Sequence, residues 1–283
     1  MARRLTWVDV FTDAPLAGNQ LAVVHDADGI PDEVQGAFAH ETNLSETTFV
    51  QRPTEEGADY RNRIWMPRLE LPFAGHPSLG TAVAVARARG EEEASYVQQT
   101  HAGLQRLDVR RSGDQGYASV LQEPAVFGDV LDPARVLATV GLDASLAIGD
   151  DLPFQMVSTG FNHLMAPISD PEALARVRID TGALVALLDE VGSGVVYLAA
   201  VDGERAHVRG FFAQGEMIRE DPGTGSAAGP LMAHLHARRG LERLTVMQGI
   251  EMLRPCRIDC SVEGDRVRVG GDVAVVFEAQ IDL

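Results

Sequence analysis

The stretch LPFAGHPSLGTAVAVARA, residues 71–88, decides the fold that this sequence predicts. Its first half is a Gly/Pro turn that carries a histidine, and its second half is an unbroken alanine-rich helix. That helix has no polar face, so we expect it to be buried on all sides. The first turn of a helix offers unpaired N–H groups and the positive end of the helix dipole. Gly75, His76 and Ser78 are therefore candidates for binding a carboxylate or phosphate.

A second stretch of the same design is EDPGTGSAAGPLMAH, residues 220–234. It again has a Gly-rich turn, a serine near the start and a helix of small residues. Aligning AGHPSLGTA (74–82) with PGTGSAAGP (222–230) places Gly75 over Gly223 and Ser78 over Ser226. The repeat predicts two halves of similar build, each with one buried helix whose N-terminus points at a shared cleft.

Composition excludes several classes of partner. The chain has 283 residues, with 41 acidic against 24 basic side chains and a formal net charge of −17. Such a surface repels nucleic acid and anionic lipid, so neither is expected as a partner. No run approaches the ~20 apolar residues of a membrane span, and no signal peptide precedes the first strand. We expect a soluble, cytoplasmic protein.

The order of the expected elements indicates an α+β fold. Strands come in antiparallel runs separated by glycines and not in strict βαβ alternation. At roughly 100–200 residues per domain, the length suggests two domains. We place an N-terminal lobe at 1–124 and a C-terminal lobe at 125–271, with a C-terminal strand over 272–283 that could return to the first lobe. Helices are expected over 32–42, in the second half of 71–88, and over 132–140, 170–177, 181–190 and 226–239.

Three titratable residues stand where chemistry could occur. Glu46 lies in SETTFV, between a polar turn and an apolar strand, where partial burial would raise the pKa of a carboxyl and suit it to proton transfer. An exposed glutamate at a strand start is the alternative. His76 stands between Gly and Pro and could equally be a structural turn residue. Asp221 precedes Pro222 and could cap the second helix, a role that is compatible with catalysis.

Nucleotide and metal sites find little support. Dinucleotide-binding loops follow an apolar parallel strand and use a glycine spacing that GTGSAAG (223–229) lacks. His234 and His236 are two residues apart on a helix and cannot share a face. Cys256 and Cys260 are too few for a disulfide framework and lack other zinc ligands nearby. We expect no metal and no cofactor.

Four ordered motifs carry a resemblance over essentially the whole chain. VDVFTDAPLAGNQLAVV, ETNLSETTFV, LPFAGHPSLGTA and EDPGTGSAAGPL together resemble the PhzF-like isomerases of phenazine biosynthesis. The resemblance implies the diaminopimelate epimerase fold, in which each of two pseudo-symmetric lobes wraps a mostly antiparallel sheet or barrel around a central helix. It also implies a homodimer. Related epimerases carry a cysteine before each central helix, but this chain has Ala74 and Pro222 there, so a two-thiol mechanism is excluded.

The resemblance also implies roles for single residues. Glu46 matches the acid/base carboxylate, and His76 and Asp221 would face the substrate beside it. A larger set would bind the substrate, chiefly its carboxylate: Asn19, Ser45, Gly75, Ser78, Gly225 and Ser226.

The leading hypothesis is a cofactor-independent isomerase that moves a proton and a double bond on a small unsaturated carboxylic or amino acid of secondary metabolism. Two alternatives stay open. One is an epimerase or racemase of a small amino acid, and the other is a non-catalytic metabolite-binding protein of the same fold.

Overall fold

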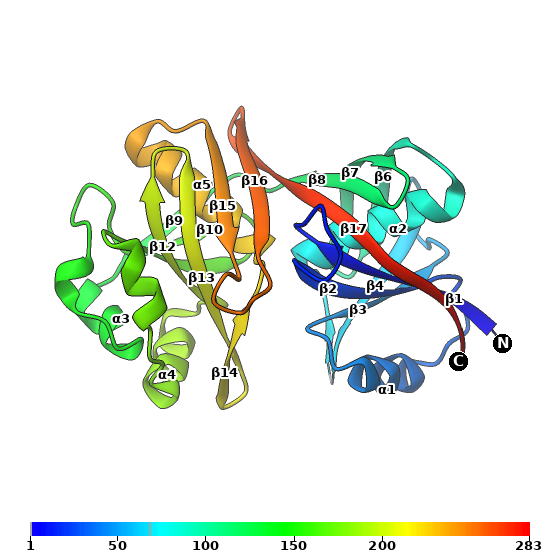
Figure 1. Ribbon diagram of the computed structural model, residues 1–283, viewed down its shortest axis with the longest axis horizontal. Coiled ribbons are helices and arrows are strands. Elements are labelled where there is room, and N and C mark those ends of the chain that lie inside the picture. The colour runs from blue at the N-terminus through cyan, green and yellow to red at the C-terminus, as the bar shows by residue number, and fades with distance from the viewer. Residues whose placement is uncertain (1, 68) are drawn as a thin grey trace. The chain divides into compact units, whose positions relative to one another are not determined.

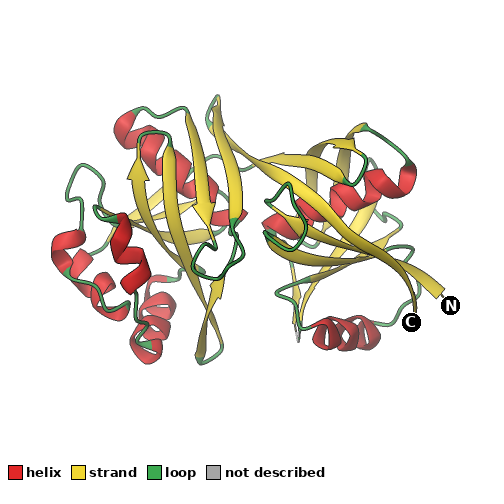
Figure 2. Ribbon diagram, in the orientation of Figure 1, coloured by secondary structure: helices red, strands yellow, loops and turns green. Residues whose placement is uncertain are grey.

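The computed structural model describes residues 2–67 and 69–283 (Figure 1). The chain forms two compact units. Unit 1 contains the residues up to Leu121 and those from Gly270 to Leu283, and unit 2 contains Gln122–Val269. Strands and helices mix in both units, and the strands pair mostly antiparallel (Figure 2). The predicted α+β class is confirmed.

Unit 1 is a closed ring of strands. The ring runs β1, β2, β3, β4, β6, β7, β8 and β17, and β17 closes it by pairing with both β8 and β1. The elements are β1 (Ala2–Val10), β2 (Asn19–Val24), α1 (Asp32–Thr42), β3 (Thr47–Gln51), β4 (Tyr60–Met66), β5 (Leu69–Leu71), α2 (Gly75–Arg89), β6 (Glu93–Thr100), β7 (Gly103–Ser112), β8 (Gln115–Leu121) and β17 (Arg266–Asp282).

The helix α2 lies inside this ring, as its apolar sequence predicts. Its residues from His76 to Ala86 are all buried, and it contacts β1, β2, β3, β4, β6, β7 and β8 (Figure 1). Gly80 allows the closest approach, because a Cβ at this position would lie 2.7 Å from Leu21 Cδ2. The amphipathic helix α1 packs outside the ring against β3 and β4.

Unit 2 contains a sheet with helices on both faces. Its strands run in the order β9, β10, β11, β12, β13, β15 and β16, and β14 adds to β13. The elements are β9 (Val126–Val130), α3 (Pro133–Thr139), the 3₁₀ helix η1 (Ala144–Leu146), β10 (Gln155–Ser158), β11 (Asn162–Ile168), the 3₁₀ helix η2 (Pro171–Arg176), α4 (Thr181–Val191), β12 (Val195–Asp202), β13 (Arg205–Gln214), β14 (Met217–Asp221), α5 (Gly225–Arg239), β15 (Arg243–Gln248) and β16 (Cys256–Glu263).

The central strand β12 shows how the two faces are covered. Val196, Leu198 and Ala200 face the core formed with α3, α4 and η2. Val195, Tyr197 and Ala199 point to the opposite face and are buried too, and α5 contacts the neighbouring strands β10, β11, β15 and β16. A strand that is covered on both faces reads as a continuous apolar run, as this one does.

The two units repeat one design, as predicted. In each, a helix joins two parallel strands, α2 between β4 and β6 and α5 between β13 and β15. Both helices have 15 residues and end at a left-handed glycine, Gly90 or Gly240. The expected pairing of Gly75 with Gly223 and of Ser78 with Ser226 is wrong by two residues. The helices begin at Gly75 and Gly225, so His76 matches Ser226. Matching the two serines misled the alignment.

Several predicted boundaries differ from the structure. Directly after the lobe boundary predicted at 124/125 lies β9, a strand whose residues are all exposed. The polar segment before the second helix forms β14, which pairs with β13. The C-terminal strand expected over 272–283 begins earlier, because β17 runs without a break from Arg266 to Asp282. Gly270 and Gly271 lie inside it, and the lack of a Cβ at Gly270 leaves room for Tyr117 Oη, which would lie 2.7 Å from one.

Candidate active site

The first group of site residues lies in unit 1 around the start of α2. His76, in the first turn of this helix, is 6% exposed, and its Nε2 lies 3.4 Å from Glu46 Oε2. Its Nδ1 lies 3.2 Å from Asn19 Nδ2. Glu46 is itself only 14% exposed. The structure thus brings together Asn19, Glu46 and His76, which lie far apart in the sequence.

Local topology explains why these side chains meet. Asn19 begins β2 and Glu46 directly precedes β3. These strands are parallel, so their first residues lie at the same edge of the sheet. The turn before Asn19 depends on Gly18, which has φ 68°, and a Cβ there would lie 2.5 Å from the Val10 carbonyl oxygen. A glycine is therefore required where the chain enters the site.

Burial sets the charge of His76. It lowers the pKa of this imidazole to about 3, because removal from water penalises the charged form. Near neutral pH the ring is therefore uncharged, and it can offer one hydrogen-bond donor and one acceptor. The contact between His76 and Glu46 is one between a carboxyl group and a neutral imidazole and not an ion pair.

The other predicted residues of unit 1 have different surroundings. Gly75 is half-buried at the first position of α2, and its N–H belongs to the orphan donors of the helix start. Ser45 is half-buried next to Glu46 in sequence. Ser78 is fully buried, and its hydroxyl donates to the Ala74 carbonyl at 2.8 Å and accepts from Gln98 at 2.7 Å. Ser78 therefore stabilises the turn from inside, and its hydroxyl does not join the group around Glu46.

The second group lies in unit 2 around the start of α5. Asp221 ends β14, and its Oδ2 accepts a hydrogen bond of 2.7 Å from Thr224 Oγ. Thr224 is the N-cap residue of α5, but its side chain caps no helical N–H. Asp221 was expected to cap this helix, and the structure instead ties its carboxylate to the N-cap hydroxyl.

Ser226 and Gly225 occupy the first turn of α5. Ser226 Oγ lies 3.2 Å from His163 Nε2, a ring that burial keeps neutral by lowering its pKa to about 4. The Gly225 carbonyl accepts a 3.0 Å hydrogen bond from Gln122 Nε2. Gln122 in turn accepts one of 2.5 Å from Thr159 Oγ. The first turn of α5 is thus held from β11 and from the segment that follows β8.

Sequence reasoning missed His163, Thr224 and Gln248. Gln248 offered a signal, because Leu244, Val246 and Gln248 share the buried face of β15 by alternation. A polar side chain on the apolar face of a strand needs buried hydrogen-bond partners. No comparable signal marks His163, which looks like any polar residue at a strand start.

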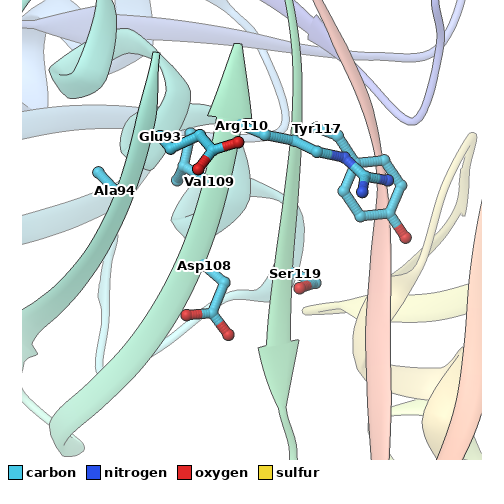
Figure 3. Close-up of a pocket in the computed structure, with 7 residues that line it drawn as sticks. All are labelled: Glu93, Ala94, Asp108, Val109, Arg110, Tyr117 and Ser119. Atoms are coloured by element: carbon cyan, nitrogen blue, oxygen red, sulfur yellow. The ribbon is translucent and has the colours of Figure 1, made fainter. Parts of the chain in front are cut away.

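A separate cavity of about 470 Å³ opens over β6, β7 and β8 in unit 1 (Figure 3). It is lined by charged side chains such as Glu93, Asp108 and Arg110, and by none of the predicted site residues. The Arg110 guanidinium lies 4.4 Å from the centroid of the Tyr117 ring, and Asp108 accepts a hydrogen bond from Ser95. Arg110 and Asp108 thus have partners within the unit, and we assign the cavity no chemistry.

Within residues 2–67 and 69–283, no three His, Cys, Asp or Glu side chains lie close enough together to hold a metal ion. Over the same described ranges, none of the helices has the length and apolar character needed to cross a membrane.

Comparison with known proteins decides the family. Residues 8–279 match the family model PhzC-PhzF, described as phenazine biosynthesis-like protein. The chain belongs to this family. It is 34% identical to the trans-2,3-dihydro-3-hydroxyanthranilate isomerase of Pseudomonas aeruginosa, over 99% of both chains. The PhzF-like resemblance of its motifs is confirmed, and the chain is an isomerase.

Solved structures agree with this PhzF-type fold. A Pseudomonas aeruginosa protein described as a predicted epimerase is 35% identical over 99% of both chains, with a TM-score of 0.87. A probable proline racemase from Agrobacterium radiobacter, only 12% identical, has a TM-score of 0.65 over 99% of this chain and 93% of its own. The second likeness shows that racemases share the fold.

Proposed function

We propose that this isomerase moves one proton, and with it a double bond, on a small unsaturated carboxylic acid, with Glu46 as both base and acid. The observation that carries the proposal is the pairing of Glu46 with a buried, uncharged His76 at 3.4 Å. A positively charged neighbour would favour the ionised carboxylate and make it a weaker base. A neutral imidazole leaves Glu46 free to take up and return a proton.

The reaction needs no net donor or acceptor. The Glu46 carboxylate removes a proton from a tetrahedral carbon next to the unsaturated system, and the electron pair of that C–H bond becomes part of the shifted double bond. The carbon at the far end of the system then takes the proton back from the Glu46 carboxyl group. One C–H bond breaks and one forms, and Glu46 ends as it began.

His76 would orient both partners of this transfer. Its Nδ1 lies 3.2 Å from the Asn19 amide nitrogen, and its Nε2 lies 3.4 Å from Glu46 Oε2. In the tautomer with the proton on Nε2, the ring would hold one carboxylate oxygen and direct the other to the substrate. Such fixed donors cost no reorganisation when the proton moves.

The starts of the two central helices supply the remaining groups. Helix N-termini bind anions through unpaired N–H groups and the helix dipole. Each helix start offers such groups within its own unit, the Gly75 N–H in unit 1 and the Gly225 and Ser226 N–H groups in unit 2, and these are the candidates to bind the substrate carboxylate. Asp221, held by Thr224, would accept a hydrogen bond from an amino or hydroxyl group of the substrate.

The substrate class follows from the relatives. The Pseudomonas aeruginosa relative is named for trans-2,3-dihydro-3-hydroxyanthranilate, a cyclic diene that bears an amino and a carboxyl group. We propose a substrate of this class, an unsaturated ring or chain with both groups. Asp221 suits the amino group by charge, and the helix starts suit the carboxylate.

Proton NMR of the alkene region tests the proposal directly. The wild-type protein should convert trans-2,3-dihydro-3-hydroxyanthranilate or a related diene amino acid, seen as a shift of the alkene signals. The test variant is Glu46→Gln, which should not give this shift. Glu41→Gln, which changes an exposed glutamate of α1, is its control for charge and handling. Unchanged alkene signals for every diene acid, with line broadening that shows binding, would replace the isomerase mechanism by simple sequestration.

One observation favours epimerisation as the second candidate. The 35% identical solved protein is described as a predicted epimerase. Epimerisation would invert a stereocentre and leave the double bonds in place, so chiral chromatography of the same reaction mixtures separates the two. We expect the alkene shift and no inversion, because both cysteines are buried in β16 and neither lies in the turns before α2 and α5.

A further inference from the structure

The side chain of Gln248, the last residue of β15, is buried with no exposed surface and is fully hydrogen-bonded. Its Oε1 accepts from Tyr197 Oη at 2.8 Å and from the Thr224 N–H at 3.0 Å. Its Nε2 donates to the Asp221 carbonyl at 2.7 Å and to Thr224 Oγ at 2.9 Å. An amide can make two bonds of each kind, so Gln248 uses its whole capacity here.

These bonds converge on the turn between β14 and α5. Gln248 Nε2 donates to Thr224 Oγ, so the hydroxyl proton of Thr224 must point elsewhere. It points to Asp221 Oδ2 at 2.7 Å. An N-cap threonine usually accepts from a helical N–H, but this one does not. The Ala227 N–H donates to the Thr224 carbonyl at 3.1 Å, so the N–H groups of Gly225 and Ser226 are those that the first turn can offer to a ligand.

The surrounding backbone is shaped to admit this network. A Cβ at Gly210 would lie 3.0 Å from Gln248 Nε2 and 3.1 Å from Thr224 Oγ, so a larger residue would push against both. Gly249 has φ 76°, and a Cβ there would lie 2.6 Å from the Pro222 carbonyl oxygen. Both glycines bring the chain close to the Asp221–Thr224 turn. Tyr197, fully buried, fixes the far side of the amide.

We infer that Gln248 is a positioning residue of the isomerase, which fixes the Asp221 carboxylate through Thr224 and leaves the first turn of α5 open to the substrate carboxylate. This inference rests on the proposed function for the role of Asp221. Gln248 itself touches no reacting atom. Its hydrogen bonds select one rotamer of Thr224 and, through it, one orientation of Asp221.

A kinetic double-mutant cycle tests the inference. Gln248→Met keeps the length of the side chain and removes its hydrogen bonds, and we expect kcat to fall about 10- to 100-fold, as misplacement of a site group does. Thr224→Val removes the relaying hydroxyl and should give a similar loss. If Gln248 and Thr224 both act through Asp221, adding Gln248→Met or Thr224→Val to Asp221→Asn should lower kcat less than about twofold further.

If kcat of the double variant Gln248→Met/Asp221→Asn falls by the product of the two single losses, Gln248 acts on the fold and not through Asp221. That result would overturn the inference. The control is Gln155→Met. Gln155 is also a buried glutamine of unit 2, bonded to Gly128 and Arg238 away from the start of α5. Gln155→Met should change kcat less than about twofold, which is within the error expected for independent sites.

Hydrogen exchange provides a readout that needs no substrate. The backbone amide of Thr224 should exchange about 5-fold faster in Gln248→Met, which corresponds to one lost hydrogen bond of about 1 kcal/mol. Gln155→Met should leave this amide unchanged. If the wild-type protein turns over no diene acid, the proposed function fails. Hydrogen exchange of the Thr224 amide then still tests whether Gln248 holds the turn. An unchanged exchange rate in Gln248→Met would overturn the inference even where catalysis is intact.

Discussion

The starts of α2 and α5 share one backbone arrangement but carry different side chains. Both helices have 15 residues, follow a three-residue turn and begin with glycine. At the second helical position, unit 1 has His76 beside Glu46, and unit 2 has Ser226 beside His163. One start holds a carboxylate next to an uncharged ring, and the other holds a hydroxyl and a hydrogen-bonded carboxylate. This difference is why we propose proton transfer for unit 1 and substrate orientation for unit 2.

Two buried glutamines extend the comparison. Gln98 and Gln248 occupy matching positions in the strand after each central helix, and both are fully buried. Gln98 donates to Ser78 and accepts from Asn62, so it stabilises the inside of its helix turn. Where unit 1 has Asn62, the paired strand of unit 2 has Gly210, which leaves room for Thr224. Without a side chain at Gly210, Gln248 can bond both Thr224 and the Asp221 carbonyl.

The largest expected effect is the loss of kcat on substitution of Glu46, compared with the smaller loss at Asp221. Glu46→Gln should lower kcat about 10³-fold, within the range for loss of general acid–base catalysis. Asp221→Asn should cost only about 10- to 100-fold, because it removes an orienting group. Steady-state kinetics on the diene acid, with thermal unfolding as a check of the fold, measures both. The reverse order would assign the base to unit 2.

A glycine in each central helix tests how tightly the two helices are packed. Gly80→Ala would place a Cβ 2.7 Å from Leu21 and 2.8 Å from Val10, so we expect the free energy of unfolding to fall by about 1–3 kcal/mol. In α5, Gly229→Ala would place a Cβ 1.8 Å from Gln122 Oε1 and displace the amide that bonds Gly225 and Thr159, so the gain in helix propensity of about 1 kcal/mol should offset only part of the cost. Urea unfolding measures both variants, and an unchanged free energy of unfolding in either one would contradict close packing of that helix.

The pH dependence of stability tests the buried histidines of both units. His76 and His163 have pKa values lowered to about 3 and about 4 by burial, against 6.5 in the unfolded chain. Between about pH 4 and 6.5 the unfolded chain binds more protons, so stability falls as pH falls through this window. His163→Asn should reduce the slope of unfolding free energy by at most about 1.4 kcal/mol per pH unit.

His76→Asn should reduce that slope by the same amount. Urea unfolding at several pH values measures the three proteins together. A slope that responds to one histidine and not to the other would show that only one of the two units keeps its imidazole uncharged.

The smallest effect is expected at Ser226. Ser226→Ala removes a neutral hydroxyl but keeps the backbone N–H groups, so KM should rise about 2- to 10-fold with little change in kcat. The matching serine of the sequence alignment, Ser78, gives the contrast. Ser78→Ala should lower stability and leave KM unchanged, because its hydroxyl bonds within unit 1. A rise in KM for Ser78→Ala would restore it to the substrate-binding set.

Much of the fold could be predicted, because it rests on local patterns. The apolar run of α2 predicts a buried helix, and the repeat of turn and helix predicts α5. The strands β9 and β14 were not predicted, because β9 has no buried face and β14 is polar and only half-buried. In the site, Glu46 and His76 could be named from their motifs. The bonds of Gln248 could not, because they depend on which strand passes next to the turn at Asp221.

Glu46 can act as base and acid beside His76 only while that imidazole stays uncharged, and nitrogen-15 NMR of the ring measures this directly. We predict that the ring signals of His76, assigned by comparison with His76→Gln, do not titrate between about pH 5 and pH 8, because burial lowers the pKa to about 3. A titration with a midpoint near the ordinary value of 6.5 would show an imidazolium next to Glu46 and contradict the proposed proton transfer.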